Sequence, residues 1–233
     1  MLTKNEESTI QDVILKINSW LQSNSEINSS LAIVDDSVDR TCERASSQGV
    51  QVVKGQGRGL GHSYLLGLNW ALKQNPEYIL TLDGDGQVDL VELSIFWKTA
   101  VEENMDLVLA SRFLEKNKIG YIYPSCNRYG VAMLTWFMNF TSGVNITDSH
   151  GGIRLYSARA AKAIRLRGLH TYVQESILSI ASSKFKIKEI SSAWKPRSQG
   201  QSRVVRSRTK YMVKMFFPLM LTGIGCVYRR MTA

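Results

Sequence analysis

The chain has 233 residues, of which 44% are apolar, so it is long enough for one sizeable folded domain and is not a disordered chain. Its net charge of +9 equals the number of Lys and Arg side chains after Glu189, in a segment without acids, so the first 189 residues are balanced. The three cysteines form no C-x-x-C pair, which indicates neither a zinc site nor a disulfide framework and favours a reducing compartment.

Strand and helix patterns alternate through the first half of the chain. Apolar residues at helical spacing predict a helix over 8–21, and leucine-rich stretches predict further helices over 65–72 and 90–102. Short apolar runs predict strands over residues 31–34, 50–53, 78–82 and 106–110. This alternation is typical of an α/β fold with a mostly parallel sheet flanked by helices, in which ligands bind beyond the carboxyl ends of the strands.

The stretch T-L-D-G-D-G-Q (81–87) directly follows the apolar run 78–80 and begins within the third predicted strand. In an extended backbone residues two apart point to the same side, so Asp83 and Asp85 would place two carboxylates together. Mg²⁺ and Mn²⁺ prefer a few carboxylates plus substrate phosphates, which makes a nucleotide diphosphate a natural ligand. For the triplet alone, a solvated acidic turn is the alternative. An EF-hand is disfavoured, because Gln87 and Val88 occupy positions that need Asp or Asn and Gly.

Two other segments carry signals for anionic ligands. The glycine-rich residues 55–61 complete neither G-x-G-x-x-G nor Gly-Lys-Ser/Thr, so a nicotinamide enzyme is not expected. Arg58 could approach a phosphate or be an exposed base in a turn.

Residues 215–228 are strongly apolar but shorter than the roughly 20 residues of a spanning helix. With bases on both sides they indicate an interfacial segment on an anionic membrane; a terminal helix packed on the domain is the alternative. Nucleic acid is disfavoured, because few aromatic residues lie among the bases.

Nine stretches in order over residues 3–203 carry a family resemblance. They include T-K-N-E-E, V-D-D-S-V-D-R-T, L-D-G-D-G-Q, L-A-S-R-F, D-S-H-G-G-I-R-L-Y and R-S-Q-G-Q-S-R. Together they resemble the family-2 inverting glycosyltransferases of GT-A fold, and among them the polyprenyl-phosphate sugar synthases of the dolichol-phosphate mannose synthase type. The resemblance implies a glycosyltransferase domain over 1–190 and a basic, apolar, membrane-associating segment over 191–233.

The implied reaction is a transfer, with inversion and with Mg²⁺ or Mn²⁺, of a sugar from a nucleotide-diphosphate sugar to a polyprenyl phosphate at the cytoplasmic face of a membrane. The alternatives are a saccharide hydroxyl acceptor in cell-surface glycan synthesis, or a shortened, inactive relative. Donor contacts are expected from Asn5, Glu6, Asp35, Asp36, Arg58, Asp83, Arg197, Ser202 and Arg203. The metal would be held by Asp83, Asp85 and Gln87. Acceptor contacts are expected from Arg112, Arg128 and Asp148, and catalytic roles from Asp85, Arg112, Arg128 and Glu175.

The nature of the acceptor decides what the protein must supply. A sugar hydroxyl calls for a general base, for which Glu175 is the candidate, whereas a polyprenyl phosphate is already an anion and needs cations such as Arg112 and Arg128. Glu175 could equally be a structural acid. The predicted helix over 131–140 is apolar on nearly every side, as expected either beside lipid or in a buried core.

The start of the chain departs from the family pattern. The family opens with an apolar strand in the middle of the sheet, but here only Met1 and Leu2 precede T-K-N-E, so this first strand is expected to be missing and to leave a gap. The segment V-D-D-S-V-D-R-T is one residue shorter than usual and lacks a glycine after its paired acids. Both departures affect the donor pocket.

Overall fold

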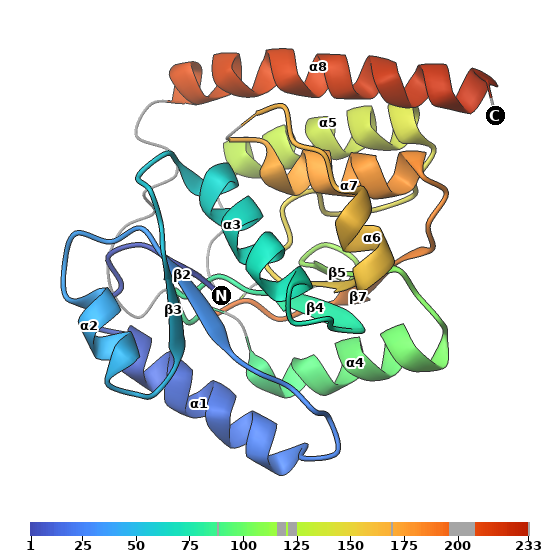
Figure 1. Ribbon diagram of the computed structural model, residues 1–233. Coiled ribbons are helices and arrows are strands. Elements are labelled where there is room, and N and C mark those ends of the chain that lie inside the picture. The colour runs from blue at the N-terminus through green and yellow to red at the C-terminus, as the bar shows by residue number, and fades with distance from the viewer. Residues whose placement is uncertain (88, 116–119, 121–124, 169, 196–207, 233) are drawn as a thin grey trace.

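The computed structural model describes residues 1–87, 89–115, 120, 125–168, 170–195 and 208–232. The described chain forms three layers, with a twisted sheet between two groups of helices (Figure 1). α3, α5, α6 and α7 cover one face of the sheet, with α8 packed outside α5 and α7, and α1, α2 and α4 cover the other face. The helices are α1 (Ile10–Ser23), α2 (Thr41–Ser46), α3 (Leu60–Leu72), the 3-10 turn η1 (Leu90–Glu92), α4 (Leu93–Glu102), α5 (Ser125–Ser142), α6 (Ala158–Ala163), α7 (Tyr172–Ser182) and α8 (Arg208–Thr232).

The strands form two hydrogen-bonded groups, ordered β1-β2-β3 and β4-β6-β5-β7. They are β1 (Leu2–Thr3), β2 (Ala32–Asp35), β3 (Gln51–Lys54), β4 (Tyr78–Thr81), β5 (Leu107–Ser111), β6 (Arg154–Ser157) and β7 (Ile187–Ser191). β1, β2 and β3 pair in parallel, as do β5 and β7. β6 lies antiparallel between β4 and β5. The predicted α/β fold is confirmed, and the antiparallel β6 is the part that the strand-helix alternation did not indicate.

Apolar spacing explains the layers. Ile10, Val13, Ile14 and Ile17 of α1 are buried at intervals of three and four, so one face of this helix packs against the sheet. β5 is buried along its whole length, which is typical of a strand covered by helices on both faces. Ser157 caps the N-terminus of α6, because its hydroxyl accepts a hydrogen bond from the backbone N–H of Ala160.

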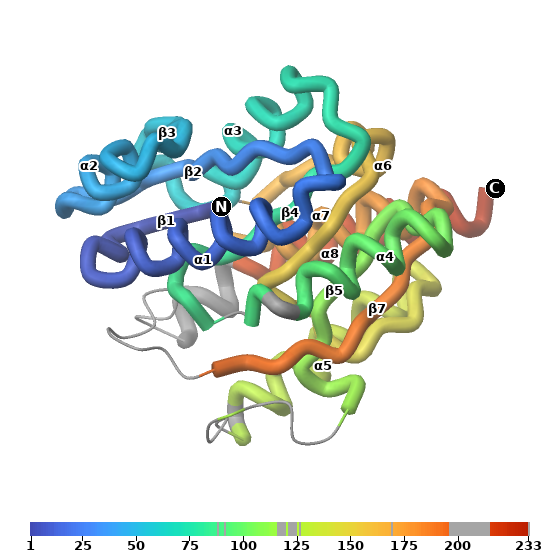
Figure 2. Tube along the Cα trace, turned by 90° about the horizontal axis from the view of Figure 1, so that it is seen from below, coloured from blue at the N-terminus to red at the C-terminus, as the bar shows by residue number. Residues whose placement is uncertain are grey.

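The expectation that the first strand is missing is corrected in part. Leu2–Thr3 forms a two-residue strand that pairs with Val34 and Asp35 of β2. On its other side, the Leu2 N–H donates to the Leu82 carbonyl (3.1 Å), and the Gly84 N–H donates to the Leu2 carbonyl (2.9 Å). Figure 2 shows the N-terminus in the middle of the molecule, between β2 and β4. A shortened strand therefore joins the two groups of strands at their carboxyl ends.

The C-terminal helix packs on the domain through one of its faces. Met215, Leu219 and Cys226 of α8 are buried in the core that α5 and α7 also line. The Thr222 hydroxyl donates to Glu175 on α7 (2.8 Å). None of the described helices is long and apolar enough to cross a membrane.

Candidate active site

The predicted site residues gather where the parallel strands end. Asp35 is the last residue of β2 and Asp36 follows it. Asp83 lies two residues beyond β4, and Arg112 comes directly after β5. β1 brings two of these ends together, because Leu2 pairs with both Val34 and Asp83. In α/β sheets of this kind, ligands bind at the edge where the strand ends meet, so we expect a ligand here.

Neutral donors hold the paired acids after β2. The Thr3 hydroxyl donates to Oδ1 of the buried Asp35 (2.8 Å). Asp36 accepts from the Gly57 N–H (2.9 Å) and from the Ser63 hydroxyl (2.9 Å), so it links β2 to the glycine-rich loop and the start of α3. Arg58 is exposed on that loop. Within the part of the chain that the structure describes, the two carboxylates are held without an ion pair to a Lys or Arg.

Asn5 and Glu6 connect the turn after β1 to the loop after β2. The Asn5 side-chain oxygen accepts from the Val38 N–H (2.9 Å), and the Glu6 N–H donates to the Thr41 hydroxyl (2.9 Å). Asn5 has φ of +51°, a conformation that Asn tolerates better than most residues. These bonds therefore hold the turn that carries Asn5 and Glu6 against the segment that follows β2.

The D-G-D-G-Q stretch turns sharply against β1. A side chain at Gly84 would place its Cβ 2.5 Å from the Thr3 methyl group, so only glycine allows this approach. Asp83 continues the strand direction, whereas Gly84 and Asp85 lie in a turn, which differs from the fully extended geometry assumed from the sequence. Asp85 is buried and its Oδ1 accepts from the Gln87 N–H (3.1 Å).

The residues around Asp83 and Asp85 fit a hard divalent cation. Two carboxylates and the Gln87 amide are oxygen donors of the kind that Mg²⁺ and Mn²⁺ take together with phosphates. A Cβ at Gly152 would lie 3.2 Å from Asp83 Oδ2, so the absence of a side chain keeps room beside this carboxylate. The Gln87 Nε2 donates to the Lys195 carbonyl (3.0 Å). Among the described residues, no group of three or more His, Cys, Asp or Glu side chains could hold a metal.

A buried ion pair marks the other side of the site. Arg112 Nε and Nη2 donate to the two Asp148 carboxylate oxygens (2.7 and 2.8 Å). Burial opposes ionisation of Asp148, but the bonds from Arg112 outweigh it, and the pKa of Asp148 lies below its usual value. The Arg112 guanidinium also lies over Phe113 and Trp194, 5.2 and 4.9 Å from their ring centres.

Arg128 approaches the same aromatic ring from another element. It is exposed near the start of α5, and its guanidinium carbon lies 5.8 Å from the centre of the Phe113 ring. Phe113 therefore brings together the two arginines that the sequence predicts for the acceptor. The sequence indicates Phe113 only as part of L-A-S-R-F, and Trp194 was not predicted. The position of Trp194 directly before the basic residues Lys195 and Arg197 is the sequence signal that could have indicated it.

Glu175 is held as a structural acid. It is fully buried, and its Oε2 accepts from the N–H groups of Arg167 and Gly168 and from the Thr171 hydroxyl. Its Oε1 accepts from Thr222 of α8. A carboxylate with four donors on it is a poor general base, so the geometry does not support the catalytic role predicted for Glu175 and favours the structural alternative. Arg197, Ser202 and Arg203 lie outside the described residues.

The family follows from comparison with known proteins. The profile of glycosyl transferase family 2 matches residues 1–165. The chain belongs to this family. The low-salt glycan biosynthesis hexosyltransferase Agl6 of Haloferax volcanii is 27% identical over 198 residues, 84% of this chain and 47% of that protein. The undecaprenyl-phosphate mannosyltransferase of Micrococcus luteus is 26% identical over 117 residues, 48% of this chain and 45% of that protein.

Solved structures confirm the GT-A fold of this family-2 chain. Glucosyl-3-phosphoglycerate synthase from Mycobacterium tuberculosis, in complex with Mn²⁺, UDP and phosphoglyceric acid, superposes with a TM-score of 0.64 at 15% identity, covering 97% of this chain and 76% of that one. Mannosyl-3-phosphoglycerate synthase from Rubrobacter xylanophilus gives 0.67 at 15% identity, covering 100% and 74%. The chain spans about half the length of the curated relatives that it matches.

Proposed function

We propose that this protein transfers a sugar from a nucleotide-diphosphate sugar to a polyprenyl phosphate, with inversion and with Mg²⁺ or Mn²⁺, at the cytoplasmic face of a membrane. The donor would lie along Asp35, Asp36, Asp83 and Asp85. The acceptor phosphate would lie at Arg128, on the opposite side of the site. The finding that a relative is an undecaprenyl-phosphate mannosyltransferase supports this choice of acceptor.

A single observation carries the choice of a lipid acceptor. α5 begins beside Arg128 and then exposes an apolar stripe of Tyr129, Met133, Trp136 and Phe140, each between 61% and 77% exposed. These residues are spaced at four, three and four positions, so they lie along one side of the helix. A single helix thus offers a cation to a phosphate head group and an apolar surface to the chain attached to it.

The C-terminal helix offers a second stripe of the same kind. Phe217, Leu221, Ile224 and Tyr228 of α8 have the same spacing and are between 49% and 70% exposed. α8 lies next to α5, because the Arg230 guanidinium donates to the Phe140 carbonyl (3.1 Å), and Arg229 stands beside it in the last turn. Bases next to exposed apolar side chains suit a peripheral helix on an anionic membrane surface.

The reaction requires different stabilisation at the donor diphosphate and at the acceptor phosphate. As the bond to the anomeric carbon breaks, negative charge accumulates on the leaving nucleoside diphosphate. A divalent cation bound at Asp83, Asp85 and Gln87 would stabilise that charge, an effect of several kcal/mol. Asp85 is kept in position by the Gln87 N–H, so its carboxylate is ready to face a cation.

The acceptor phosphate has to be positioned, but it does not need a general base. A lipid phosphate is an anion at neutral pH, so the protein has to orient it and offset its charge. Arg128 supplies the charge, and Arg112 is held rigidly by Asp148 with its guanidinium against Phe113. Neither Asp148, in its ion pair, nor Glu175, with four hydrogen bonds, is arranged to deprotonate a sugar hydroxyl, which disfavours a saccharide acceptor.

The test is a turnover assay with purified protein and vesicles that carry polyprenyl phosphate. GDP-mannose, UDP-glucose and UDP-N-acetylglucosamine are supplied in turn, and nucleoside diphosphate release is followed with Mn²⁺ and with a chelator. Release with one donor should require both the metal and the lipid phosphate. Turnover that continues after chelation, or that is as fast on vesicles without the lipid phosphate, would contradict the proposal.

A further inference from the structure

A buried arginine lies close to the D-G-D-G-Q stretch. Arg154 belongs to β6, and only 1% of its surface is exposed. Its Nε donates to the Thr81 hydroxyl at 3.4 Å, and its Nη1 has no hydrogen-bond partner among the described residues. Burying a cation costs free energy unless negative charge close by compensates for the lost water. The surroundings of Arg154 should therefore show where that negative charge lies.

Aromatic rings cover the Arg154 guanidinium. Its central carbon lies 5.4 Å from the ring centre of Tyr172 on α7 and 5.9 Å from that of Tyr64 on α3. The two ring centres lie 5.0 Å apart, and both tyrosines are buried. Cation–π contacts recover part of the lost hydration, but a neutral ring does not balance a full charge. Burial and the charge of Asp83 raise the pKa of Tyr172, so this phenol is neutral at pH 7 and Asp83 lies within electrostatic reach of it.

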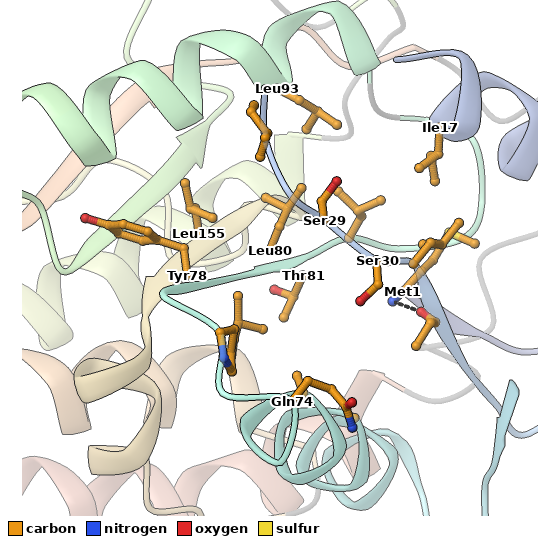
Figure 3. A pocket seen from close by; sticks show the side chains of 18 of the residues that line it. Met1, Ile17, Ser29, Ser30, Gln74, Tyr78, Leu80, Thr81, Leu93 and Leu155 are labelled. Atoms are coloured by element: carbon orange, nitrogen blue, oxygen red, sulfur yellow. Dashed lines mark hydrogen bonds between the residues drawn. The ribbon is translucent and has the colours of Figure 1, made fainter. Parts of the chain in front are cut away.

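The pairing of β4 with β6 puts Arg154 and Asp83 on one face of the sheet. Arg154 lies opposite Thr81 in this antiparallel pair, and Figure 3 shows Thr81 on the α3 side of β4. Asp83 continues the strand two residues further on, so its side chain points to the same side. It lies beside Gly152, where an added Cβ would be 3.2 Å from Asp83 Oδ2. Asp83 is therefore the diagonal cross-strand neighbour of Arg154, a position at which long side chains interact.

The charges of Arg154 and Asp83 support one another. Burial opposes the charge of Arg154, but the neighbouring tyrosines and Asp83 outweigh it, and the pKa of Arg154 lies above its ordinary value. Arg154 is therefore a permanent cation inside the protein. It would repel a divalent cation bound to Asp83 and Asp85, and because Arg154 is buried this repulsion is only weakly screened.

We propose that Arg154 is a positioning residue of the metal site, which holds the Asp83 carboxylate on the α3 side of the sheet and weakens the binding of Mg²⁺ or Mn²⁺ to the site without donor. This inference rests on the metal site of the proposed function and says how that site is controlled. A donor diphosphate brings negative charge that offsets the charge of Arg154, so metal and donor bind cooperatively. The site then holds its metal tightly only while a nucleotide diphosphate is bound.

The first experiment measures the Kd of Mn²⁺ from the paramagnetic resonance signal of the free ion, at pH 7 and without nucleotide. Arg154→Met removes the charge and keeps much of the volume, so the Kd should fall by about tenfold. Arg154→Lys keeps the charge and should change the Kd by less than about threefold. Replacing a residue that only filled the core would leave the Kd unchanged or raise it, and either result for Arg154→Met would overturn the proposal.

A matched control and added nucleotide make this measurement specific. Arg159→Met removes an exposed arginine of α6 that pairs with Asp106, so it should leave the Kd of Mn²⁺ unchanged. A fall as large as that of Arg154→Met would show a general charge effect and would overturn the proposal. With UDP and GDP added in turn, the Kd of the natural chain should fall by a larger factor than that of Arg154→Met. Equal factors would overturn the cooperative binding of metal and donor.

The second experiment is a thermal unfolding cycle with a chelator present. Asp83→Asn should lower the Tm of the natural chain by about 5 °C, because Arg154 loses its counter-charge, and should leave the Tm of Arg154→Met nearly unchanged. Equal shifts in the two backgrounds would overturn the pairing of Arg154 with Asp83. Arg154→Gln, which is also neutral, takes the place of Arg154→Met in both experiments if that variant does not fold.

The two proposals fail in different ways. A natural chain that binds no Mn²⁺, even with UDP or GDP, would overturn both the metal site of the proposed function and this inference. Mn²⁺ binding that Arg154→Met leaves unchanged would overturn this inference alone.

Discussion

The donor side and the acceptor side of the site hold their carboxylates in different ways. Asp36 accepts from a hydroxyl and a backbone N–H, which are neutral, and Asp35 accepts from hydroxyls. Asp148 is instead neutralised by Arg112 in a buried ion pair. The first arrangement keeps negative charge on the donor side, near the proposed metal site at Asp83 and Asp85, and the second leaves Arg128 exposed on the acceptor side. Under the proposed function, this difference would let the site receive two anions, one through a metal and one through an arginine.

The largest effect is expected from breaking the acceptor-side ion pair. Asp148→Asn leaves the Arg112 charge buried without its carboxylate, so the free energy of unfolding should fall by about 3–5 kcal/mol. Urea denaturation at pH 7 measures this change. Glu43→Gln, in the exposed pair with Arg40, is the control and should leave the urea midpoint unchanged. An equal loss of stability in the two variants would contradict the claim that the buried Arg112–Asp148 pair stabilises the fold more than the exposed Arg40–Glu43 pair.

On the donor side the expected effect is on turnover. Asp85→Asn removes a metal-binding charge while keeping the shape of the turn, so the rate should fall by about 10²–10³-fold. Thermal unfolding should be nearly unchanged, because the Gln87 N–H can still donate to the amide oxygen. Asp12→Asn on the exposed side of α1 is the matched control. Normal metal-dependent turnover of Asp85→Asn would contradict the assignment of Asp85 to the metal site on the donor side.

Glu175 tests whether any carboxylate of the acceptor half acts as a base. Because its four hydrogen bonds are structural, Glu175→Gln should lower the free energy of unfolding by about 1–3 kcal/mol. The pH profile of turnover should keep its shape, although the rate falls with the folded population. Loss of an acidic limb from that profile would instead show that Glu175 removes a proton.

His150 adds a pH dependence to the acceptor half. Burial lowers the pKa of His150 to about 4, so the folded protein binds its proton less readily than the unfolded chain does. Stability is therefore complete above the usual histidine pKa and is lost as the pH falls from about 6.5 to about 4. Between pH 6.5 and 4.5, His150→Gln should reduce the loss of unfolding free energy by about 2 kcal/mol. If the unfolding free energies of the two proteins fall in parallel as the pH is lowered, groups other than His150 cause the pH dependence.

Sequence patterns predicted most of the donor half. Parallel strands with helices between them follow from apolar spacing, and β2, β3, β4 and β5 lie within one residue of the predicted ranges. Their carboxyl ends carry the acids because strand, turn and acid are consecutive in the chain. Local sequence therefore contains almost all the information that places Asp36 and Asp83.

The acceptor half depends on contacts that a sequence pattern does not contain. β6 inserts antiparallel between β4 and β5, and this pairing joins residues about 75 and 47 positions apart. The Arg112–Asp148 pair and the four hydrogen bonds of Glu175 likewise form only in the folded chain. The two-residue β1 was missed for another reason: such a short strand has no periodicity, and it forms because neighbouring edges offer hydrogen bonds.

The most direct test of the account compares polyprenyl phosphate with uncharged polyprenol as acceptors for the natural chain and for Arg128→Gln. Initial rates are measured over a range of acceptor concentrations, with Mn²⁺ and the donor that supports turnover. The account predicts transfer to the phosphate alone, and a rise of about tenfold or more in KM for the lipid phosphate in Arg128→Gln with a smaller change in kcat. Equal transfer to polyprenol, or an unchanged KM in this variant, would contradict the claim that this side of the site receives a lipid phosphate.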